Sequence, residues 1–196
     1  MFAPRRDRLP PLDAEALTEA QRRAADELTA GPRRGVIGPF APLLRSPELL
    51  QHAQRMGEYL RYRSAIGTRL SELVILLIAR YWAQRVEWSI HAPIAATAGI
   101  PAETIAAIAA GRRPSSLSED EAIVYDFCFE LNVEQDVRDP TFDRALVRFG
   151  EQGVVDLMGL NGYYTFLAMV MNAAHTEPSA TVSSPLAPLP PRTWYA

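Results

Sequence analysis

Residues 68–82 are TRLSELVILLIARYW, and residues 83–98 continue with AQRVEWSIHAPIAATA. The first segment is apolar almost all round when it is placed on a helix, which is typical of a helix buried at the centre of a domain. The second segment is mixed in polarity and is followed by Gly99, a residue type that commonly follows a helix. The sequence therefore predicts a central buried helix over Thr68–Trp82 and a second helix from about Gln84 to Ala98.

Helix signals recur on both sides of this central pair. Ser46, Pro47 and Glu48 are typical of a helix start, because serine caps, proline suits the first turn and glutamate favours the positive end of the helix dipole. Ser118 and Glu121 have the spacing of a capping box. The further helices that the sequence predicts cover residues 13–28, with Asp13 as the cap, and residues 46–62, 101–111, 118–131, 139–149 and 151–172.

No segment shows the alternation of a β-strand, so the sequence predicts an all-α fold. We expect a compact array of about seven or eight helices around a central helical hairpin. Residues 13–177 form the single predicted domain. A basic, proline-rich arm precedes it over residues 1–12, and a proline-rich tail follows over residues 178–196.

Composition limits the classes of partner. The formal net charge is −3, and the arginine clusters at residues 5–8 and 33–34 are short and lie in proline- and glycine-rich sequence. We interpret these clusters as solvated, so no basic stripe points to nucleic acid.

The expected location is the cytoplasm. The first residues lack the apolar stretch of a signal peptide, and the longest apolar run, Leu73–Ala79, is too short to cross a bilayer. Cys128 is the only cysteine, so an intramolecular disulfide is impossible. We therefore expect neither a membrane nor a nucleic-acid partner.

Three polar residues form one strip on the second predicted helix. With about 100° between successive residues, Gln84, Glu87 and His91 lie together beside a mainly apolar stripe, where a pocket wall would be. Glu87 can touch His91 one turn away, orient its ring and favour its protonated form. Such a pair can move protons, but the same spacing is common in surface ion pairs, so a structural role stays open.

Glu72 is a second unusual residue, because it is a carboxylate inside the most apolar predicted helix. It is either a charge near the helix start that backbone N–H groups satisfy, or a buried group with a side-chain partner. The first interpretation is favoured by its place one turn into the helix.

Residues 71–98 resemble the signature hairpin of the carboxymuconolactone decarboxylase and alkylhydroperoxidase-D superfamily. The resemblance covers roughly residues 36–175 and includes the Gly38-Pro39-Phe40 segment and Ser46-Pro47-Glu48-Leu49. The peroxidase branch carries Cys-x-x-Cys-x-x-x-His with an upstream glutamate. Its histidine matches His91, its cysteines fall on Gln84 and Glu87, and its glutamate falls on Glu72.

The missing thiols change the chemistry that the resemblance implies. Peroxide reduction needs two thiols as nucleophile and resolving group, and Gln84 and Glu87 can be neither. Cys128 lies in an apolar run, where thiols are usually buried and inert. A thiol peroxidase is therefore not expected, and the acid–base part of the site remains, as in the decarboxylase branch.

The resemblance implies a cofactor-free and metal-free lyase that acts on a small anionic substrate, cyclic or derived from an aromatic compound. His91 would donate or shuttle the proton and Glu87 would orient it. Glu72 would be a second acid–base group or the partner that fixes the tautomer of His91. Substrate contacts are expected from Arg80, whose alternative is an ion pair with one of these glutamates, and from Gln84 and Trp88.

Several alternatives stay open. The chain could be a non-catalytic oligomeric binding protein of the same fold, or a related isomerase or hydrolase that uses the same pair. Trp82, Trp88, Tyr163 and Tyr164 either line a pocket or pack in the core. The apolar faces of the predicted helices, including residues 163–171, predict a homo-oligomer, either a dimer, a trimer or a hexamer.

The predicted hairpin makes a geometric demand. Along one continuous helix, Glu72 and His91 would be about 28 Å apart, at a rise of about 1.5 Å per residue. They can meet within one chain only if the helix breaks between Trp82 and Val86, although no glycine or proline marks that point. We predict this break.

Overall fold

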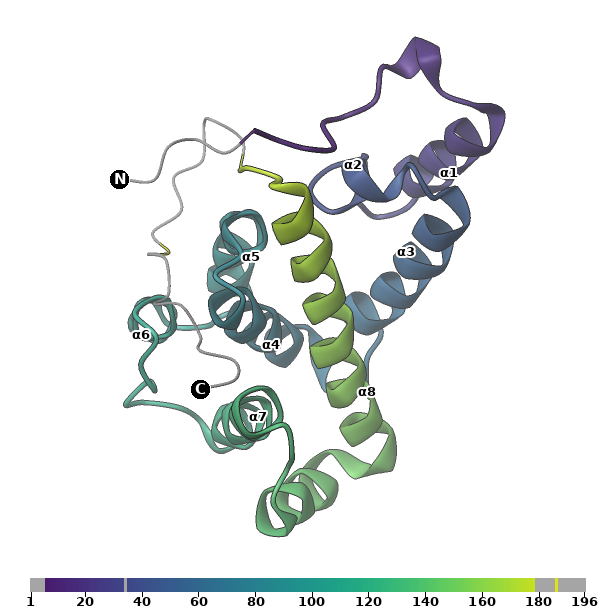
Figure 1. Cartoon of the computed structure of the whole chain (residues 1–196). Helices are drawn as coiled ribbons and strands as arrows, with labels where there is room; N and C mark the ends of the chain where they lie inside the picture. Colours follow the sequence, from purple (N-terminus) through teal and green to yellow (C-terminus); the bar gives the residue numbers. More distant parts are fainter. Residues whose placement is uncertain (1–5, 34, 179–185, 187–196) are drawn as a thin grey trace.

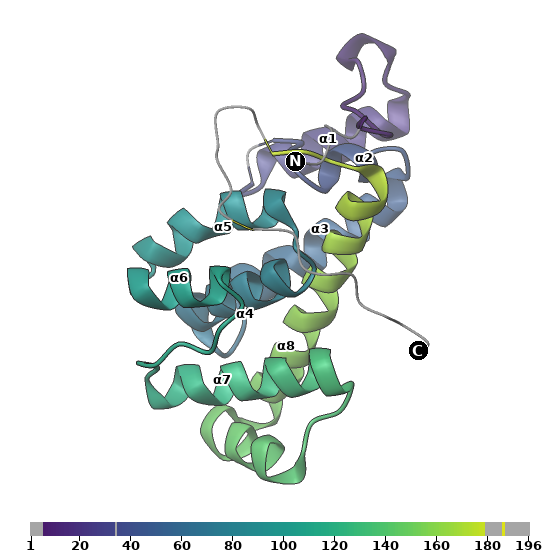
Figure 2. The same ribbon diagram turned by 60° about the vertical axis from the view of Figure 1, so that its left-hand side comes forward.

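The computed structural model describes residues 6–33, 35–178 and 186. Over these residues the protein is all-α, as predicted, with eight α-helices and no strand. Figures 1 and 2 show the helices as a compact array. The helices are α1 (Glu19–Ala30), α2 (Phe40–Leu43), α3 (Pro47–Tyr62), α4 (Gly67–Tyr81), α5 (Arg85–Thr97), α6 (Ala102–Ala109), α7 (Glu119–Phe129) and α8 (Asp139–Ala174).

Helix α4 is the centre of the array. Leu73, Val74, Ile75 and Leu76 are all completely buried, which explains why the sequence is apolar almost all round here. The helix packs against α5, α7 and α8, and α8 also packs against α3 (Figure 1). A central helix covered on every side can hold a polar residue only if that residue has partners.

The predicted break between α4 and α5 is confirmed. Helix α4 ends at Tyr81, Ala83 has a positive φ of 50°, and Gln84 caps α5 by accepting a hydrogen bond from Val86 N at 2.7 Å. A non-glycine residue in this region is strained, so other contacts must hold it. Asn172 of α8 supplies them: it donates to Trp82 O at 3.0 Å and accepts from Gln84 Nε2 at 2.9 Å.

The prediction of one first helix over residues 13–28 is wrong. Asp13 caps only a short 3₁₀ turn, Ala14–Ala16, and α1 begins afterwards at Glu19. Thr18 is the cap, in a reciprocal capping box with Gln21. Thr18 and Gln21 therefore mark the true helix start in the sequence.

The two helices predicted over residues 139–149 and 151–172 join without a loop. Gly150 has a φ of 68° and a ψ of 176°, so α8 consists of two segments that meet at a bend. Only glycine adopts this backbone conformation readily, which is why the chain can turn here within a single residue.

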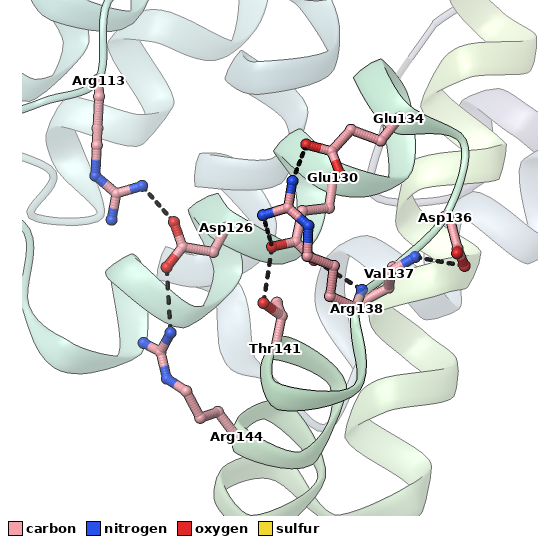
Figure 3. A network of polar contacts seen from close by, with 9 residues as sticks. All are labelled: Arg113, Asp126, Glu130, Glu134, Asp136, Val137, Arg138, Thr141 and Arg144. Carbon is pink, nitrogen blue, oxygen red and sulfur yellow. Dashed lines mark hydrogen bonds and ion pairs between the residues drawn. The ribbon is translucent and has the colours of Figure 1, made fainter.

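A polar network fixes the corner that leads from α7 into α8 (Figure 3). After α7 the chain makes a π-helical turn, Glu130–Glu134. The buried Glu130 accepts hydrogen bonds from Thr141 Oγ1 at 2.8 Å and from Arg138 N at 2.9 Å. Asp126 of α7 pairs with Arg113 and Arg144. These contacts tie the π-helical turn to the first turn of α8.

Helix α8 is also the one helix in the described part of the chain that is long and apolar enough to cross a membrane, by length and composition alone. More than half of its most apolar window is buried inside the protein, and core helices pass the same test. The longest unbroken apolar run, Leu73–Ala79, did not reveal it, because polar residues interrupt the apolar positions of α8.

The described part of the predicted N-terminal arm lies against the end of α8. Arg8 donates its backbone N–H to Ala174 O at 2.8 Å and its guanidinium to Ala173 O at 3.1 Å. The arm's first five residues, and all of the predicted tail except Pro178 and the buried Leu186, lie outside the described residues.

Candidate active site

Glu72, Glu87 and His91 come together inside the hairpin of α4 and α5. His91 Nδ1 lies 2.6 Å from Glu72 Oε2, and His91 Nε2 lies 3.3 Å from Glu87 Oε2. The first distance is that of a strong hydrogen bond to a carboxylate. His91 therefore lies between two carboxylates, one from each helix of the hairpin. All three residues are at least 97% buried.

Glu72 is not a helix-start charge, and that interpretation is wrong. Its side chain is completely buried, and its carboxylate binds side chains of two other helices, His91 of α5 and Arg61 of α3, whose Nε lies 3.2 Å from Glu72 Oε1. A buried carboxylate is stable only when it is paired and hydrogen-bonded in this way. Glu72 thus connects Arg61 to His91.

A cavity of about 230 Å³ lies against this cluster. Its walls come from the loop before α2 and from helices α2, α3, α5 and α8. Figure 1 shows how these four helices are arranged. Its ionisable and aromatic lining includes Arg33, Phe40, Arg61, Glu87, His91 and Tyr164. Glu72 is not among the residues that line the cavity, so it contacts His91 on the side away from the cavity.

Burial raises the pKa of Glu87, against the opposing effects of His91, Arg33 and Arg61. Glu72, a like charge, raises it further. A carboxyl group with a raised pKa keeps its proton to higher pH than an exposed one. While Glu87 is neutral, two guanidinium groups face one carboxylate, so the cluster has an excess of positive charge that suits an anion.

Arg33 is held in place rather than solvated, which corrects the interpretation of that cluster. Its guanidinium lies 4.7 Å from the centre of the Phe40 ring, and its Nη2 donates to the Tyr163 hydroxyl at 3.4 Å. Gly57 of α3 leaves room for this contact, because a Cβ there would overlap both Tyr163 and Arg33. The neighbouring Arg34 lies outside the described residues.

Tyr164 belongs to the wall that α8 contributes. Its ring packs edge-on against His91, with ring centres 5.5 Å apart, and only 1% of its surface is exposed. Burial raises the pKa of its hydroxyl well above the ordinary value, and the nearby charge of Glu87 adds to the rise. Within the described part of the chain, neither this hydroxyl nor Arg33 Nε has a hydrogen-bond partner, although both atoms are buried.

The three predicted substrate-binding residues lie elsewhere. Gln84 caps α5 and binds Asn172, and Trp88 packs in the core with 1% exposure. Arg80 lines a second cavity of about 190 Å³ between α4, α6 and α7, together with Cys128. None of the three is among the described residues that line the cavity beside His91.

Arg33 and Arg61 are the site residues that the sequence did not single out. Neither lies on the polar strip, and each reaches the cluster only through the packing of distant segments. Of the two neighbouring tyrosines, Tyr164 lines this cavity, whereas Tyr163 holds Arg33 from outside it. Among the described residues, no group of three or more histidine, cysteine or acidic side chains is arranged to hold a metal ion.

Comparison of the chain with protein-family models, with curated proteins and with solved structures gave no match. Function is therefore inferred from the motif in residues 71–98 and from the geometry of this site.

Proposed function

We propose that this protein is a cofactor-free acid–base lyase of the carboxymuconolactone decarboxylase type, acting on a small anionic substrate that is cyclic or derived from an aromatic compound. The observation that carries this proposal is the position of His91, which is held between two carboxylates and lines a cavity that two arginines also line. A bound anion would find opposite charge and a proton source in one place.

The reaction that we propose needs only proton transfer and electrostatics from the protein. The bond between the carboxylate and the substrate carbon breaks, its electron pair moves into the conjugated system, and CO₂ leaves. When the electron pair returns to carbon, the carbon takes a proton from the protein, and solvent replaces that proton. A general acid beside the carbon is the group that this last step requires.

The geometry suggests how the roles divide. Glu72 makes the short contact with Nδ1, so it fixes the ring and its tautomer. His91 Nε2 and Glu87 are then the groups nearer the cavity, and one of them delivers the proton to the substrate carbon. Glu87 is suited to this because burial raises its pKa and favours its protonated form.

The test is a screen of small unsaturated cyclic carboxylates for CO₂ release, followed by kinetics of His91→Ala, Glu87→Gln and the double variant. We expect each single variant to lose about 10²–10⁴-fold in kcat, the usual range for a general acid–base group. The double variant should be little worse than the poorer single one, because groups that act as a unit are not additive. Additive losses would contradict a shared role.

A second candidate is a non-catalytic binding protein with a structural ion-pair network. It is favoured by one observation, that both ring nitrogens of His91 already have a carboxylate neighbour. In that case His91→Ala should lower the thermal midpoint of unfolding while any activity per folded molecule stays the same. Measuring both quantities on the same preparation separates the two candidates.

We also propose a cytoplasmic location and assembly of the chain into a homo-oligomer. The location accords with a chain that has a single cysteine, which is buried.

A further inference from the structure

Two residues that line the cavity each carry a buried hydrogen-bond donor that has no acceptor within the described protein. One is the hydroxyl of Tyr164, on α8, and the other is Nε of Arg33, in the loop before α2. Both residues line the same cavity, which Glu87 and His91 also line. Two residues that are 131 positions apart in the chain, each with an unsatisfied donor, thus meet at the wall of one cavity.

Such groups are costly to bury, and most buried polar groups in folded proteins have a partner. If residue 164 served only to pack the core, phenylalanine would fill the same space without an unsatisfied hydroxyl. An unsatisfied donor on a residue that lines a cavity therefore suggests an acceptor from outside the chain.

We propose that Tyr164 and Arg33 form an oxyanion site, in which the Tyr164 hydroxyl and the Arg33 Nε–H donate hydrogen bonds to a carbonyl oxygen of the substrate as negative charge develops on it. The inference rests on the proposed lyase function for its chemistry. It narrows the substrate class to molecules whose leaving carboxylate is on a saturated carbon next to a carbonyl group, or joined to one through a carbon–carbon double bond, so that the electron pair of the breaking bond reaches the carbonyl oxygen.

The two donors suit this role better than they suit the leaving carboxylate. A cation that binds the carboxylate stabilises the ground state, whereas donors at the carbonyl oxygen act where charge grows in the transition state. The raised pKa of Tyr164 keeps its hydroxyl protonated and able to donate. Arg33 is positioned beforehand by Phe40 and Tyr163, so it need not reorganise during the reaction.

The size of the cavity agrees with a single ring. A cavity of about 150 Å³ is enough to hold benzene. The volume of about 230 Å³ here leaves room for a six-membered or five-membered ring with one or two small substituents. A small planar anion is therefore a suitable probe.

The experiment uses 4-nitrophenol, because its phenolate oxygen is conjugated with a planar ring and its ionised form is visible by absorption. Titrated into the full-length protein near the pKa of the phenol, it should bind to the wild type as the phenolate. Tyr164→Phe and Arg33→Gln should each weaken phenolate binding by about tenfold or more, as expected for losing a hydrogen bond to a charged group. Tyr125→Phe, in the second cavity, is the matched control and should bind like the wild type.

Stability distinguishes this role from a packing role. Because the Tyr164 hydroxyl has no partner in the described protein, Tyr164→Phe should leave the thermal midpoint of unfolding unchanged or raise it. With a turned-over substrate, the same variant should lower kcat much more than it changes KM.

Failure of the inference and failure of the proposed function give different results. Wild-type protein that does not bind the phenolate, or equal binding by the wild type, Tyr164→Phe and Arg33→Gln, overturns the oxyanion site, even if decarboxylation is found. Phenolate binding that depends on both residues supports the oxyanion site, even if no carboxylate in the screen releases CO₂. In that case only the proposed lyase function is contradicted.

Discussion

His91 shows why the spacing of two residues is weak evidence for a site. A glutamate and a histidine one turn apart usually form a surface pair worth a few tenths of a kcal/mol. Here a third residue from another helix, Glu72, reaches the other ring nitrogen, and all three side chains are buried. Burial and the second carboxylate, rather than the spacing, set this pair apart.

Glu87 should make anion binding depend on pH. Burial raises its pKa above the ordinary 4.5, so the carboxyl group ionises only at higher pH. Ionisation adds a negative charge to a cluster that also contains Arg33, Arg61, Glu72 and His91, beside Tyr163 and Tyr164. We expect the affinity for benzoate, which is itself ionised over this range, to fall as the pH rises through the raised pKa. Equilibrium titrations at several pH values measure this fall.

Glu87→Gln is the control, because it fixes the neutral form and should remove that pH step. The same linkage applies to stability. Between 4.5 and the raised pKa the folded protein holds a proton that the unfolded chain has lost, so the free energy of unfolding should fall with rising pH in this window. A pH step in benzoate affinity that persists in Glu87→Gln would assign the titration to another group.

Cys128 should be dispensable for activity. Its side chain is buried, burial raises the pKa of the thiol to about 12, and it lies in the second cavity rather than beside His91. A thiol in this state has almost no nucleophilic thiolate at neutral pH. Cys128→Ser should therefore keep the activity per folded molecule, measured with the substrate that the screen identifies. Peroxidase turnover that requires a thiol and disappears in this variant would overturn the acid–base interpretation.

At the scale of elements, the central hairpin could be predicted, and part of the site with it. The apolar run of α4 marked a buried helix, and the positions of Glu72 and His91 required the helix to break before they could meet. No glycine or proline marks that break locally. Ala83 takes a left-handed conformation because Asn172, from the far end of the chain, binds both sides of the turn.

The rest of the site depends on contacts between segments that no local pattern encodes. Arg33 lies in a loop without periodicity, and its partner Tyr163 is 130 residues away. Tyr163 and Tyr164 are neighbours on α8, but about 100° of rotation separates them on the helix. Which of them lines the cavity is decided by how α8 packs on α3 and α4.

Gly57 on α3 provides a test of how Arg33 is positioned. A Cβ at this position would overlap the Tyr163 hydroxyl and the Arg33 guanidinium. Gly57→Ala should therefore displace Arg33 and weaken phenolate binding, and it should lower the free energy of unfolding by about 1–3 kcal/mol through overpacking. Binding titrations and chemical denaturation measure the two effects.

Gly162→Ala on α8 is the matched control, since a Cβ there would meet nothing within 4 Å. Alanine is the better helix former, so this variant should be neutral or more stable by about 0.5–1 kcal/mol, with unchanged phenolate binding. If Gly57→Ala lowered stability and left phenolate binding intact, Arg33 would not need this position to bind the anion.

At the scale of the whole molecule, the cavity needs several parts of the fold at once. Its walls come from the loop before α2 and from four helices, and the cluster behind it also needs α4. The loop that carries Arg33 lines the cavity, whereas the central hairpin includes completely buried residues on α4. Ligand affinity should therefore respond to substitutions in this loop more strongly than global stability does.

The surface of α8 is where we expect the chain to meet another copy. The residues 163–171 that first suggested an interface are mostly used within the chain, because Tyr163, Leu167 and Met171 are buried in its own core. Val155, Met158 and Met169 are instead 60%, 41% and 49% exposed, and their spacing places them on one face of the helix. An apolar stripe of this kind commonly marks an interface.

We therefore predict a homo-oligomer at micromolar concentration, which light scattering can measure. We expect Met158→Glu to shift the assembly towards the monomer, because it would bury a charge at the interface. Val147→Glu is the matched control: this side chain is 88% exposed and precedes the bend at Gly150, so the substitution should leave the assembly unchanged. A monomeric wild type would contradict the prediction. An oligomer that withstands Met158→Glu would place the interface on another face and leave the α8 stripe without this role.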